Sequence, residues 1–392
     1  MEKVKLNDIA EFIRTGKTPP TSQTQYFDGS VNWYTPGDFN NGKKLKTSRR
    51  TLTQIALDDK KAITFPKDTL LITCIGDIGK IGITQEDCSS NQQITGIKPK
   101  ENTDVNYLYY WFIANKKILE NTANSAVVPI LNNKTLQNID FEFLPLPTQQ
   151  KIAAILDKTD ELRQYNKQLI EKYDALTQSL FLDMFGDPVK NEKGFLKSTV
   201  GEQCSVKGGK RVPKEEKLVE NNTGFPYIKA GNIKKGKVTT KDLEYLLPKT
   251  REKLKRYIVN QGDVCITVVG VNIGDIGIVP KELHHANLTE NANKLLIKNE
   301  KILNNFYLAS YLQMDFIQQD ISKKTMAVGV PKLAIFRIEQ LELLLPPIEF
   351  QIKFQTSVEL IENQKKQAQE ALAKSEELFQ SLLQRAFKGE LN

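Results

Sequence analysis

Residues 147–185 read PTQQKIAAILDKTDELRQYNKQLIEKYDALTQSLFLDMF, a stretch with proline only at its first position and no glycine. It predicts a single helix about 58 Å long at ~1.5 Å per residue. Two series of residues repeat every seven positions within it. The first is Ile152, Thr159, Asn166, Tyr173 and Leu180, and the second is Ile155, Leu162, Leu169 and Leu176. This a/d pattern predicts pairing with another helix.

The C-terminal stretch carries a second, less apolar seam. Its two series are Val358, Lys365, Leu372 and Phe379, and Ile361, Ala368, Ser375 and Leu382. Such a seam is expected to need the first helix as its partner, although two independent surface helices would also fit the pattern. Asn166 is polar at a seam position, which is a common way to fix helix register.

The rest of the chain is an internal repeat with a period of about 200 residues. VNWYTPGDFNNGK (31–43) returns as FPYIKAGNIKKGK (225–237), and KDTLLITCIGDIGKIGI (67–83) returns as QGDVCITVVGVNIGDIGI (261–278). A polar patch leading into a strand, SSNQQITGI (89–97), corresponds to TENANKLLI (289–297). β-Branched runs bounded by Gly, Pro and Asn predict small mixed sheets. The chain therefore contains one folded unit twice.

The predicted fold class is α+β. Two pseudo-symmetric mixed α/β recognition domains are separated by two long helices that form an antiparallel coiled coil. The expected limits are 1–145 for the first domain, 146–187 for the central helix, 195–345 for the second domain and 346–392 for the C-terminal helix. A pseudo-two-fold axis between the copies would make the helices antiparallel. The two copies have diverged, so we expect two recognition heads with different ligands.

Charge is concentrated in the second copy. The whole chain has a formal net charge of +8, and residues 195–345 alone hold 24 Lys and Arg against 16 Asp and Glu. A basic domain indicates a polyanionic partner. DNA-binding dimers space their half-sites by whole helical turns of ~34 Å. One chain with two diverged heads predicts a bipartite, asymmetric DNA target with a gap that the spacer fixes.

Several other classes of protein are disfavoured. No apolar run approaches the ~20 residues that span a bilayer, and MEKVKLNDIAEF lacks the apolar segment of a secretory signal. The four cysteines have no metal-like spacing, and the only histidines are the adjacent His284 and His285. We expect reduced thiols, no metal site and a cytoplasmic protein.

A nucleotide hydrolase is one alternative function, because GDFNNGKK (37–44) nearly fits the phosphate-binding pattern G-x-x-x-x-G-K-[S/T]. The hydroxyl that magnesium chemistry needs is missing, since Lys44 and its counterpart Val238 hold that position. A protein-interaction adaptor that does not bind DNA is the other alternative. ATP binding by the isolated chain would favour the nucleotide hydrolase. Failure of its complex to retain specific DNA would favour the adaptor.

With these features together, the chain resembles the specificity (S) subunits of type I restriction–modification systems. The resemblance rests on an ordered set of segments covering nearly the whole chain. In the first half they are VKLNDIAEF (4–12), YTPGDFNNGK (34–43), FPKDTLLITCIGDIGKIGI (65–83), SSNQQI (89–94) and LPLPTQQKIAAIL (144–156). In the second half they are IKAGNIKKGK (228–237), QGDVCITVVG (261–270), LPPIEFQ (345–351) and LFQSLLQRAFKGEL (378–391). The second copy departs at Asn232, which replaces Asp38.

The resemblance implies a non-catalytic subunit whose target-recognition domains read double-stranded DNA. It also implies two modification (adenine-N6 methyltransferase) subunits and motor–nuclease restriction subunits as partners. The cofactors S-adenosylmethionine, ATP and magnesium would belong to those partners, with none in this chain. The exposed helix faces and the LPLP and LPP corners would dock the methyltransferases. The sequence has no Asn/Asp-Pro-Pro-Tyr tetrad, which agrees with that division of roles.

Candidate DNA-binding residues fall into four groups, because lysines suit phosphates and amides suit adenine edges. The loop after each aromatic strand supplies Asn40, Asn41, Lys43 and Lys44, then Asn232, Lys234, Lys235 and Lys237. The glycine-spaced turn supplies Thr73, Lys80 and Asn272. The polar patch supplies Ser90, Asn91, Gln92 and Gln93, then Thr289, Asn291 and Asn293. The first turn supplies Lys17, Lys207, Lys210 and Arg211. Solvated turns and structural amides are the competing interpretation of these residues.

Overall fold

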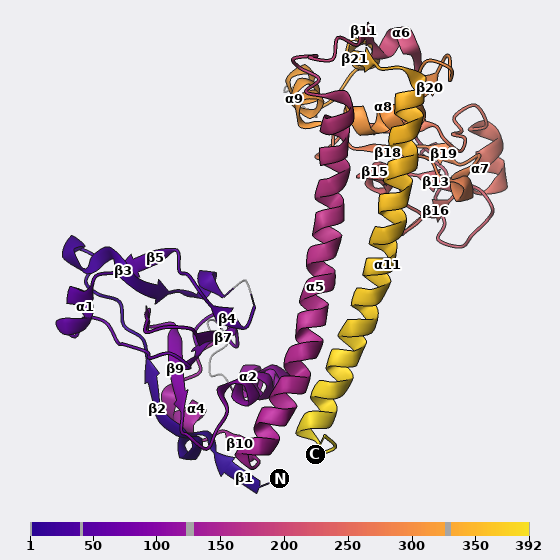
Figure 1. Ribbon diagram of the computed structural model, residues 1–392. Helices are drawn as coiled ribbons and strands as arrows, with labels where there is room; N and C mark the ends of the chain where they lie inside the picture. The colour runs from indigo at the N-terminus through magenta and orange to yellow at the C-terminus, as the bar shows by residue number, and fades with distance from the viewer. Residues whose placement is uncertain (1, 40–41, 123–128, 326–330, 392) are drawn as a thin grey trace. The chain divides into compact units, whose positions relative to one another are not determined.

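The computed structural model describes residues 2–39, 42–122, 129–325 and 331–391. Packing divides the chain into two compact units (Figure 1). Unit 1 comprises residues 1–169 and 368–392, and unit 2 comprises residues 170–367. Each unit therefore holds one repeat together with part of both long helices. The division into four segments that the sequence suggests remains a prediction, since packing groups the helices with the domains.

The described part of unit 1 contains three sheets. The largest has the strand order β2 (Ala10–Thr15), β9 (Ile94–Pro99), β6 (Leu70–Thr73), β7 (Ile81–Thr84) and β4 (Lys44–Leu45). The second has the order β5 (Arg50–Leu52), β3 (Phe27–Tyr34) and β8 (Ser89–Ser90), and the third pairs β1 (Glu2–Lys5) with β10 (Asp140–Phe143). Most neighbours are antiparallel, but β4–β7 and β3–β8 are parallel.

The described part of unit 2 repeats this topology strand for strand, with one added strand. Its large sheet has the order β12 (Cys204–Gly208), β20 (Ala292–Ile297), β17 (Val264–Thr267), β18 (Ile276–Ile278), β15 (Gly236–Val238) and β14 (Ile233–Lys234). The smaller sheets are β16 (Glu244–Tyr245), β13 (Pro226–Ile228) and β19 (Asn287–Leu288), and β11 (Leu196–Thr199) with β21 (Glu342–Leu345). The parallel pairs β15–β18 and β13–β19 match those of unit 1. The predicted duplication of a mixed α/β domain is confirmed.

Short helices complete each unit. Unit 1 has α1 (Gln54–Asp58), α2 (Val105–Ala114), α3 (Lys116–Thr122) and α4 (Asn133–Gln137). Unit 2 has α6 (Val200–Gln203), α7 (Pro248–Lys253), α8 (Asn305–Leu312), α9 (Asp315–Lys324) and α10 (Ile335–Glu339). α2 and α8 are counterparts, because Asp104 and Asn304 cap them in the same way. Each side chain accepts hydrogen bonds from the second and third backbone N–H groups of its helix.

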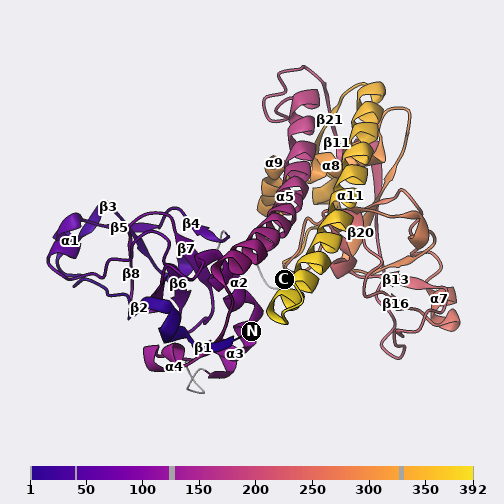
Figure 2. The ribbon, with the colours of Figure 1, turned by 60° about the horizontal axis from the view of Figure 1, so that its bottom comes forward.

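The two long helices are α5 (Leu146–Phe185) and α11 (Ile348–Phe387), of 40 residues each. Both follow a proline corner, where the helix loses no backbone hydrogen bond. α5 ends at Gly186, whose φ of +74° suits glycine beyond a helix C-terminus. Within each unit the helices lie side by side (Figures 1 and 2). None of the helices in the described residues is long and apolar enough to cross a membrane.

Contacts within each unit show that α5 and α11 run antiparallel. In unit 1 the Arg163 guanidinium lies 4.3 Å from the centre of the Phe379 ring, and Lys167 Nζ lies 3.4 Å from Glu376 Oε1. In unit 2 the rings of Phe181 and Phe354 are 5.5 Å apart. Residue numbers rise along one helix as they fall along the other. The predicted antiparallel pairing is confirmed.

The heptad prediction is correct for α11 and half correct for α5. All eight predicted seam residues of α11 are buried or half-buried, as is the series from Ile152 to Leu180. The second predicted series on α5 is wrong at two of its four members, because Leu162 and Leu176 are exposed, whereas Ile155 and Leu169 are half-buried. The inward series lies one residue later and includes Leu156 and Arg163. The apolar count missed it because Arg163 is polar, although its guanidinium covers Phe379.

Asn166 is buried on the α5 seam in unit 1. Its Nδ2 lies 3.5 Å from Ser375 Oγ on α11, at the long end of hydrogen-bond range. Two polar side chains that face each other within the seam favour one alignment of the helices over its neighbours. The contact is consistent with the predicted role in fixing register.

The first turn of each long helix is joined to its α/β domain by a buried glutamine. In unit 1, Gln149 accepts a hydrogen bond from Asp104 N at 2.9 Å and donates to the carbonyls of Leu144 and Asn102 at 2.7 and 3.1 Å. In unit 2, Gln351 accepts from Asn304 N at 2.9 Å and donates to the carbonyls of Pro346 and Ile302 at 2.8 and 2.9 Å. The bonds are the same in both units. The amide therefore fixes how each helix leaves its domain.

The main core of each unit contains the start of one long helix and the end of the other. In unit 1, Ile152 and Leu156 of α5 and Phe379 and Leu383 of α11 are buried with the residues of α2. In unit 2, Phe354 of α11 and Phe181 of α5 are buried with the residues of α8. Apolar burial of this kind is the dominant favourable contribution to folding. Helix pairing and domain folding are therefore coupled within a unit.

Candidate functional site

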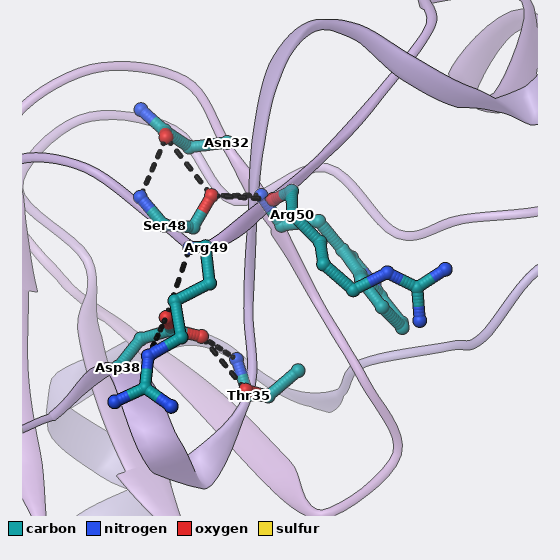
Figure 3. Close-up of polar contacts among 7 residues, drawn as sticks. Asn32, Thr35, Asp38, Ser48, Arg49 and Arg50 are labelled. Atoms are coloured by element: carbon teal, nitrogen blue, oxygen red, sulfur yellow. Dashed lines mark hydrogen bonds and ion pairs between the residues drawn. The ribbon is translucent and has the colours of Figure 1, made fainter.

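The first candidate surface lies at the end of the aromatic strand β3. A short 3-10 turn, Pro36–Asp38, follows the strand, and the Asp38 side chain closes the turn. Its carboxylate accepts hydrogen bonds from Thr35 N and Thr35 Oγ1, both at 2.7 Å, and from Arg49 N at 3.0 Å (Figure 3). The Arg49 Nε lies 4.0 Å from the same carboxylate. A carboxylate suits this position because all of its neighbours are donors.

The segment before Arg49 is fastened to β3. Asn32 Oδ1 accepts from Ser48 N at 2.9 Å, and the Ser48 hydroxyl accepts from Trp33 N at 2.9 Å. The Ser48 hydroxyl also lies 2.6 Å from the Arg50 carbonyl (Figure 3). The Arg50 guanidinium lies 5.0 Å from the centre of the Phe27 ring and 5.2 Å from that of Trp33. Both arginines are exposed on a backbone that is held in place.

Sequence reasoning stopped at Lys44 and missed Arg49 and Arg50. The signal was present in KKLKTSRR (43–50), a basic run next to the aromatic strand. The run crosses a strand boundary, because β4 ends at Leu45 and β5 begins at Arg50. Only the folded sheet brings Arg49 beside Asp38.

Lys43 has a different environment from the one that its sequence suggests. Its side chain is only 10% exposed, and its ammonium group forms an ion pair with Asp157 of α5. Tyr110 OH donates to the same carboxylate at 2.6 Å. Burial lowers the pKa of Lys43, and the pair with Asp157 opposes that shift. The lysine therefore joins the loop to the long helix. Neighbouring Lys44 is exposed, whereas Asn40 and Asn41 lie outside the described residues.

The structure argues against a phosphate-binding loop at residues 37–44. In such loops the chain passes directly into a helix whose N-terminus faces the phosphate. Here the chain after Lys43 enters the strand β4. The lysine ammonium also already has a carboxylate partner.

The counterpart loop in unit 2 begins with the same 3-10 turn, Ala230–Asn232, but has different side-chain chemistry. Asn232 Oδ1 accepts from Lys229 N at 2.9 Å, and its Nδ2 donates to the Lys241 carbonyl at 3.0 Å. An amide is needed there because one neighbour is a donor and the other an acceptor. This explains why asparagine replaces Asp38 in the second copy.

Three lysines surround the tip of the unit 2 loop. Lys235 and Gly236 have φ of +48° and +81°, the geometry of a tight hairpin turn between β14 and β15. Lys234 and Lys235 are exposed. Lys237 forms an ion pair with Glu362 of α11, but its side chain is 69% exposed. Lys237 therefore contacts a long helix in unit 2 as Lys43 does in unit 1, but its side chain is much more exposed to solvent.

The glycine-spaced turn is stabilised from within. Thr73 is fully buried, and its hydroxyl donates to the Asp77 carbonyl at 2.5 Å and accepts from Lys80 N at 3.0 Å. Lys80 Nζ lies 2.9 Å from Asp77 Oδ2. Asn272, in the corresponding turn of unit 2, is exposed. Burial favours a structural role for Thr73 and leaves Lys80 and Asn272 as the reachable candidates.

The polar patch divides into buried and exposed members. Ser90, Asn91, Thr289 and Asn293 are buried. Asn91 closes its own turn, since its Nδ2 donates to Gln93 Oε1 at 2.9 Å and its Oδ1 accepts from Gln93 N at 3.0 Å. Gln92 is exposed, and Gln93 and Asn291 are half-buried. Asn91 therefore has structural hydrogen bonds, and Gln92 is the most accessible member.

The hydrogen-bond pattern shows how the two patches correspond. Asn91 N donates to the carbonyl of Tyr34, and Thr289 N donates to the carbonyl of Ile228, at 3.0 Å in each case. Asn91 therefore corresponds to Thr289, two residues away from the correspondence implied by SSNQQITGI and TENANKLLI. A shift of two keeps the same side chains on the same face of a strand.

The first turn contacts the polar patch in both units. Lys17 N donates to the Ser90 carbonyl, and Lys210 N donates to the Leu288 carbonyl, at 2.9 Å in each case. The side chains of Lys17, Lys207, Lys210 and Arg211 are exposed, and Lys17 Nζ donates to the Lys60 carbonyl at 2.9 Å. Thr18 is hydrogen-bonded to Gln92 in unit 1, whereas Arg211 forms an ion pair with Glu290 in unit 2.

All four predicted groups are connected through the polar patch, because Cys74 N beside the glycine-spaced turn donates to the Gln93 carbonyl at 2.8 Å, as Val268 N does to the Asn291 carbonyl in unit 2. Backbone hydrogen bonds join the first turn, the polar patch and the end of the aromatic strand in each unit. Corresponding positions around them carry different side chains in the two units, exposed Arg50 in unit 1 and in unit 2 Glu244, which is half-buried and ion-paired with Lys229. Arg50 pairs with Trp33 across β3–β5, whereas Glu244 pairs with Tyr227 across β13–β16. The result is one scaffold with two different polar surfaces.

A protein built in this way is a two-headed recognition protein, with one α/β head in each unit. A family model described as the type I restriction modification DNA specificity domain matches residues 1–172 and again residues 192–371. The chain belongs to this family. The two matches correspond to the two copies of the repeat.

Individual relatives agree with the family assignment. The chain is 26% identical over 387 residues to the type I restriction enzyme MjaIX specificity subunit of Methanocaldococcus jannaschii, covering 92% of this chain and 88% of that protein. It is 23% identical over 359 residues to the EcoBI specificity subunit of Escherichia coli, covering 83% and 74%. The crystal structure of the type I restriction–modification S subunit from M. genitalium matches with a TM-score of 0.61 at 18% identity, covering 98% and 95%. That likeness supports the fold.

Proposed function

We propose that this chain is the sequence-recognition subunit of a type I restriction–modification complex. Each α/β domain reads one half of a bipartite, asymmetric DNA site, and the long helices set the gap between the halves. The observation that carries this proposal is the repeated scaffold with different side chains at corresponding positions. Two identical surfaces would suit a palindrome, whereas Arg50 in one unit and Glu244 in the other suit two different sequences.

The proposed protein partners are two modification (methyltransferase) subunits, with motor–nuclease restriction subunits joining in the complete complex. Apolar side chains that remain exposed on the long helices support docking there. In unit 1 they are Leu162, Tyr165 and Leu378, and in unit 2 they are Leu176, Leu182, Phe350, Ile352 and Leu360. Exposed apolar surface of this kind is typical of protein contact sites.

We further propose that the chain does no chemistry and works in the cytoplasm. S-adenosylmethionine, ATP and magnesium would act in the partner subunits. The thiols support this division, because all four cysteines are buried and burial raises the pKa of Cys74 to about 11 and that of Cys204 to about 12. A thiol in that state is a poor nucleophile at neutral pH.

The direct test is to map methylated adenines in DNA that has been exposed to the chain with its partner methyltransferase. We expect methylation at one sequence composed of two different half-sites separated by a fixed gap. Methylation without sequence preference, or at a palindrome, would contradict the proposal. ATP binding by the isolated chain in calorimetry would instead support the nucleotide-hydrolase alternative.

Salt dependence tests the lysines of the hairpin tip. Replacing Lys234 and Lys235 with alanine should weaken DNA binding by the complex on every sequence. The slope of log K against log salt should fall by ~1 for each phosphate contact that is lost. Replacing Lys323, an exposed lysine of α9 outside the predicted groups, provides the matched control. An unchanged slope would remove these lysines from the interface.

A further inference from the structure

Arg49 combines two properties that are rarely found together on a protein surface. Its side chain is 73% exposed, whereas the carboxylate of Asp38 beside it is only 2% exposed. The Asp38 carboxylate also accepts the Arg49 backbone N–H at 3.0 Å. Both the backbone and the Nε side of the guanidinium therefore face one buried anion (Figure 3). The Arg49 backbone is held in place, while its charged side chain projects into solvent.

The loop that carries Arg49 is held on both sides of the aromatic strand. Asn32 accepts from Ser48 N at 2.9 Å, and its Nδ2 donates to Glu86 Oε1 at 2.6 Å. Asp38 in turn is fixed by Thr35. These hydrogen bonds fix the backbone that carries Arg49, and the Asp38 carboxylate 4.0 Å from Nε favours one direction of the side chain, so that less conformational entropy is lost when the guanidinium binds. Electrostatic attraction to a phosphate alone would not need this support.

The corresponding position in unit 2 is not a cation. Because Trp33 pairs with Arg50 and Tyr227 pairs with Glu244, the residue that corresponds to Arg49 is Leu243. Leu243 packs against a hydrophobic cluster, and Asn232 stands in place of Asp38. The Asp38–Arg49 pair is therefore specific to the first domain, as expected of a residue that distinguishes the two half-sites.

We propose that Arg49 is a specificity-determining residue of the first recognition domain and contacts the edge of a guanine in the first half-site. Asp38 acts as its positioning residue. Guanine presents two acceptors, O6 and N7, in the major groove, and an arginine fork donates to both. A lysine cannot reproduce that geometry because its charge is a single point. The inference rests on the proposed function and adds the residue and the base.

The experiment measures methylation by the complex of this chain with its methyltransferase on DNA randomised across the first half-site. For the unchanged protein we expect a required guanine at one position. Arg49→Ala should lower that preference about 5- to 150-fold, the range of a good bidentate base contact. Arg49→Lys should keep binding to mixed DNA but lose the preference. Asp38→Asn should weaken the preference at the same position and leave the second half-site unchanged.

Lys46→Ala is the matched control, because it removes one exposed positive charge from the same loop and leaves the Asp38–Arg49 pair intact. The control should preserve the base preference. Equal loss for all four bases in Arg49→Ala, or an unchanged profile in Arg49→Lys, would overturn the inference. Failure of the proposed function is distinguishable, since the unchanged protein would then show no sequence preference at all.

Discussion

The two recognition units share their backbone and differ in the chemistry placed on it. The same backbone hydrogen bonds recur at the first turn and the polar patch, and the same side-chain hydrogen bonds of a glutamine recur at the start of each long helix. At corresponding positions the side chains change: Thr18 with Gln92 in unit 1 becomes Arg211 with Glu290 in unit 2, and exposed Arg50 becomes Glu244, which is ion-paired with Lys229. The comparison teaches that the scaffold positions a surface, and that the surface residues can vary without changing the scaffold.

The largest expected effect tests the shared part of this comparison. Gln149→Ala and Gln351→Ala each remove one buried hydrogen bond, to the Leu144 or Pro346 carbonyl, and two part-buried ones. At ~1–3 kcal/mol for a buried unsatisfied group and less for the part-buried ones, we expect each change to destabilise its unit by about 2–4 kcal/mol. Urea unfolding of the purified chain measures the loss. Gln150→Ala, on an exposed position of the same helix, should have little effect. A large loss of stability in only one of the two variants would contradict the equivalence of the two glutamines.

The next effect tests why the two loops carry different residues. Asn232→Asp replaces an amide that donates to the Lys241 carbonyl with a carboxylate that can only accept. We expect a loss of about 1–3 kcal/mol, because two acceptors then face each other in a buried position. Asn221→Asp makes the same change at an exposed position of the same unit and should be nearly neutral. Equal stability of the two variants would contradict this account of the difference.

The contacts between loop and long helix should differ in strength. Lys43→Ala leaves the Asp157 carboxylate half-buried without its cation, and we expect a loss of about 1–3 kcal/mol. Lys237→Ala removes a mostly exposed pair and should cost about 0.5 kcal/mol or less. Thermal unfolding of both variants against the unchanged chain makes the comparison. Equal losses of stability would show that the buried Lys43 pair stabilises the fold no more than the exposed Lys237 pair.

A smaller effect concerns pH. Because burial lowers the pKa of Lys43, the folded chain releases this proton at a lower pH than the unfolded chain does. The unfolded state then binds more protons as pH rises towards the ordinary lysine value of ~10.4, so this group makes the free energy of unfolding increase with pH there. Lys43→Met should lack that increase. Parallel pH profiles for the two proteins would contradict a lowered pKa.

The sequence predicted the repeat, the mixed α/β class and the antiparallel helices, because local periodicity and self-similarity encode them. The second heptad series on α5 could not be predicted from apolar residues, since the inward position at Arg163 is polar and packs on a ring from α11. Arg49 was missed for a similar reason. Its partner Asp38 is eleven residues away and becomes a neighbour only when β5 pairs with β3.

The candidate site shows the same limit. Asn91 and Gln92 are adjacent amides in the sequence, yet one is buried in its own turn and the other is exposed. Amides that close turns and amides that could read bases are the same residue types, Asn and Gln, so the sequence alone could not distinguish them. The long-range pairing of β3 with β8 decides which side chain faces outward.

Exchange of one domain tests the central claim most directly. Residues 195–345 would be replaced by the corresponding segment of a relative that has a different target, and methylated adenines would be mapped for the chimera in complex with its methyltransferase. We expect one half-site to change to that of the relative, while the other half-site and the gap stay the same. A change in both half-sites, or in neither, would contradict the claim that each unit reads its own half.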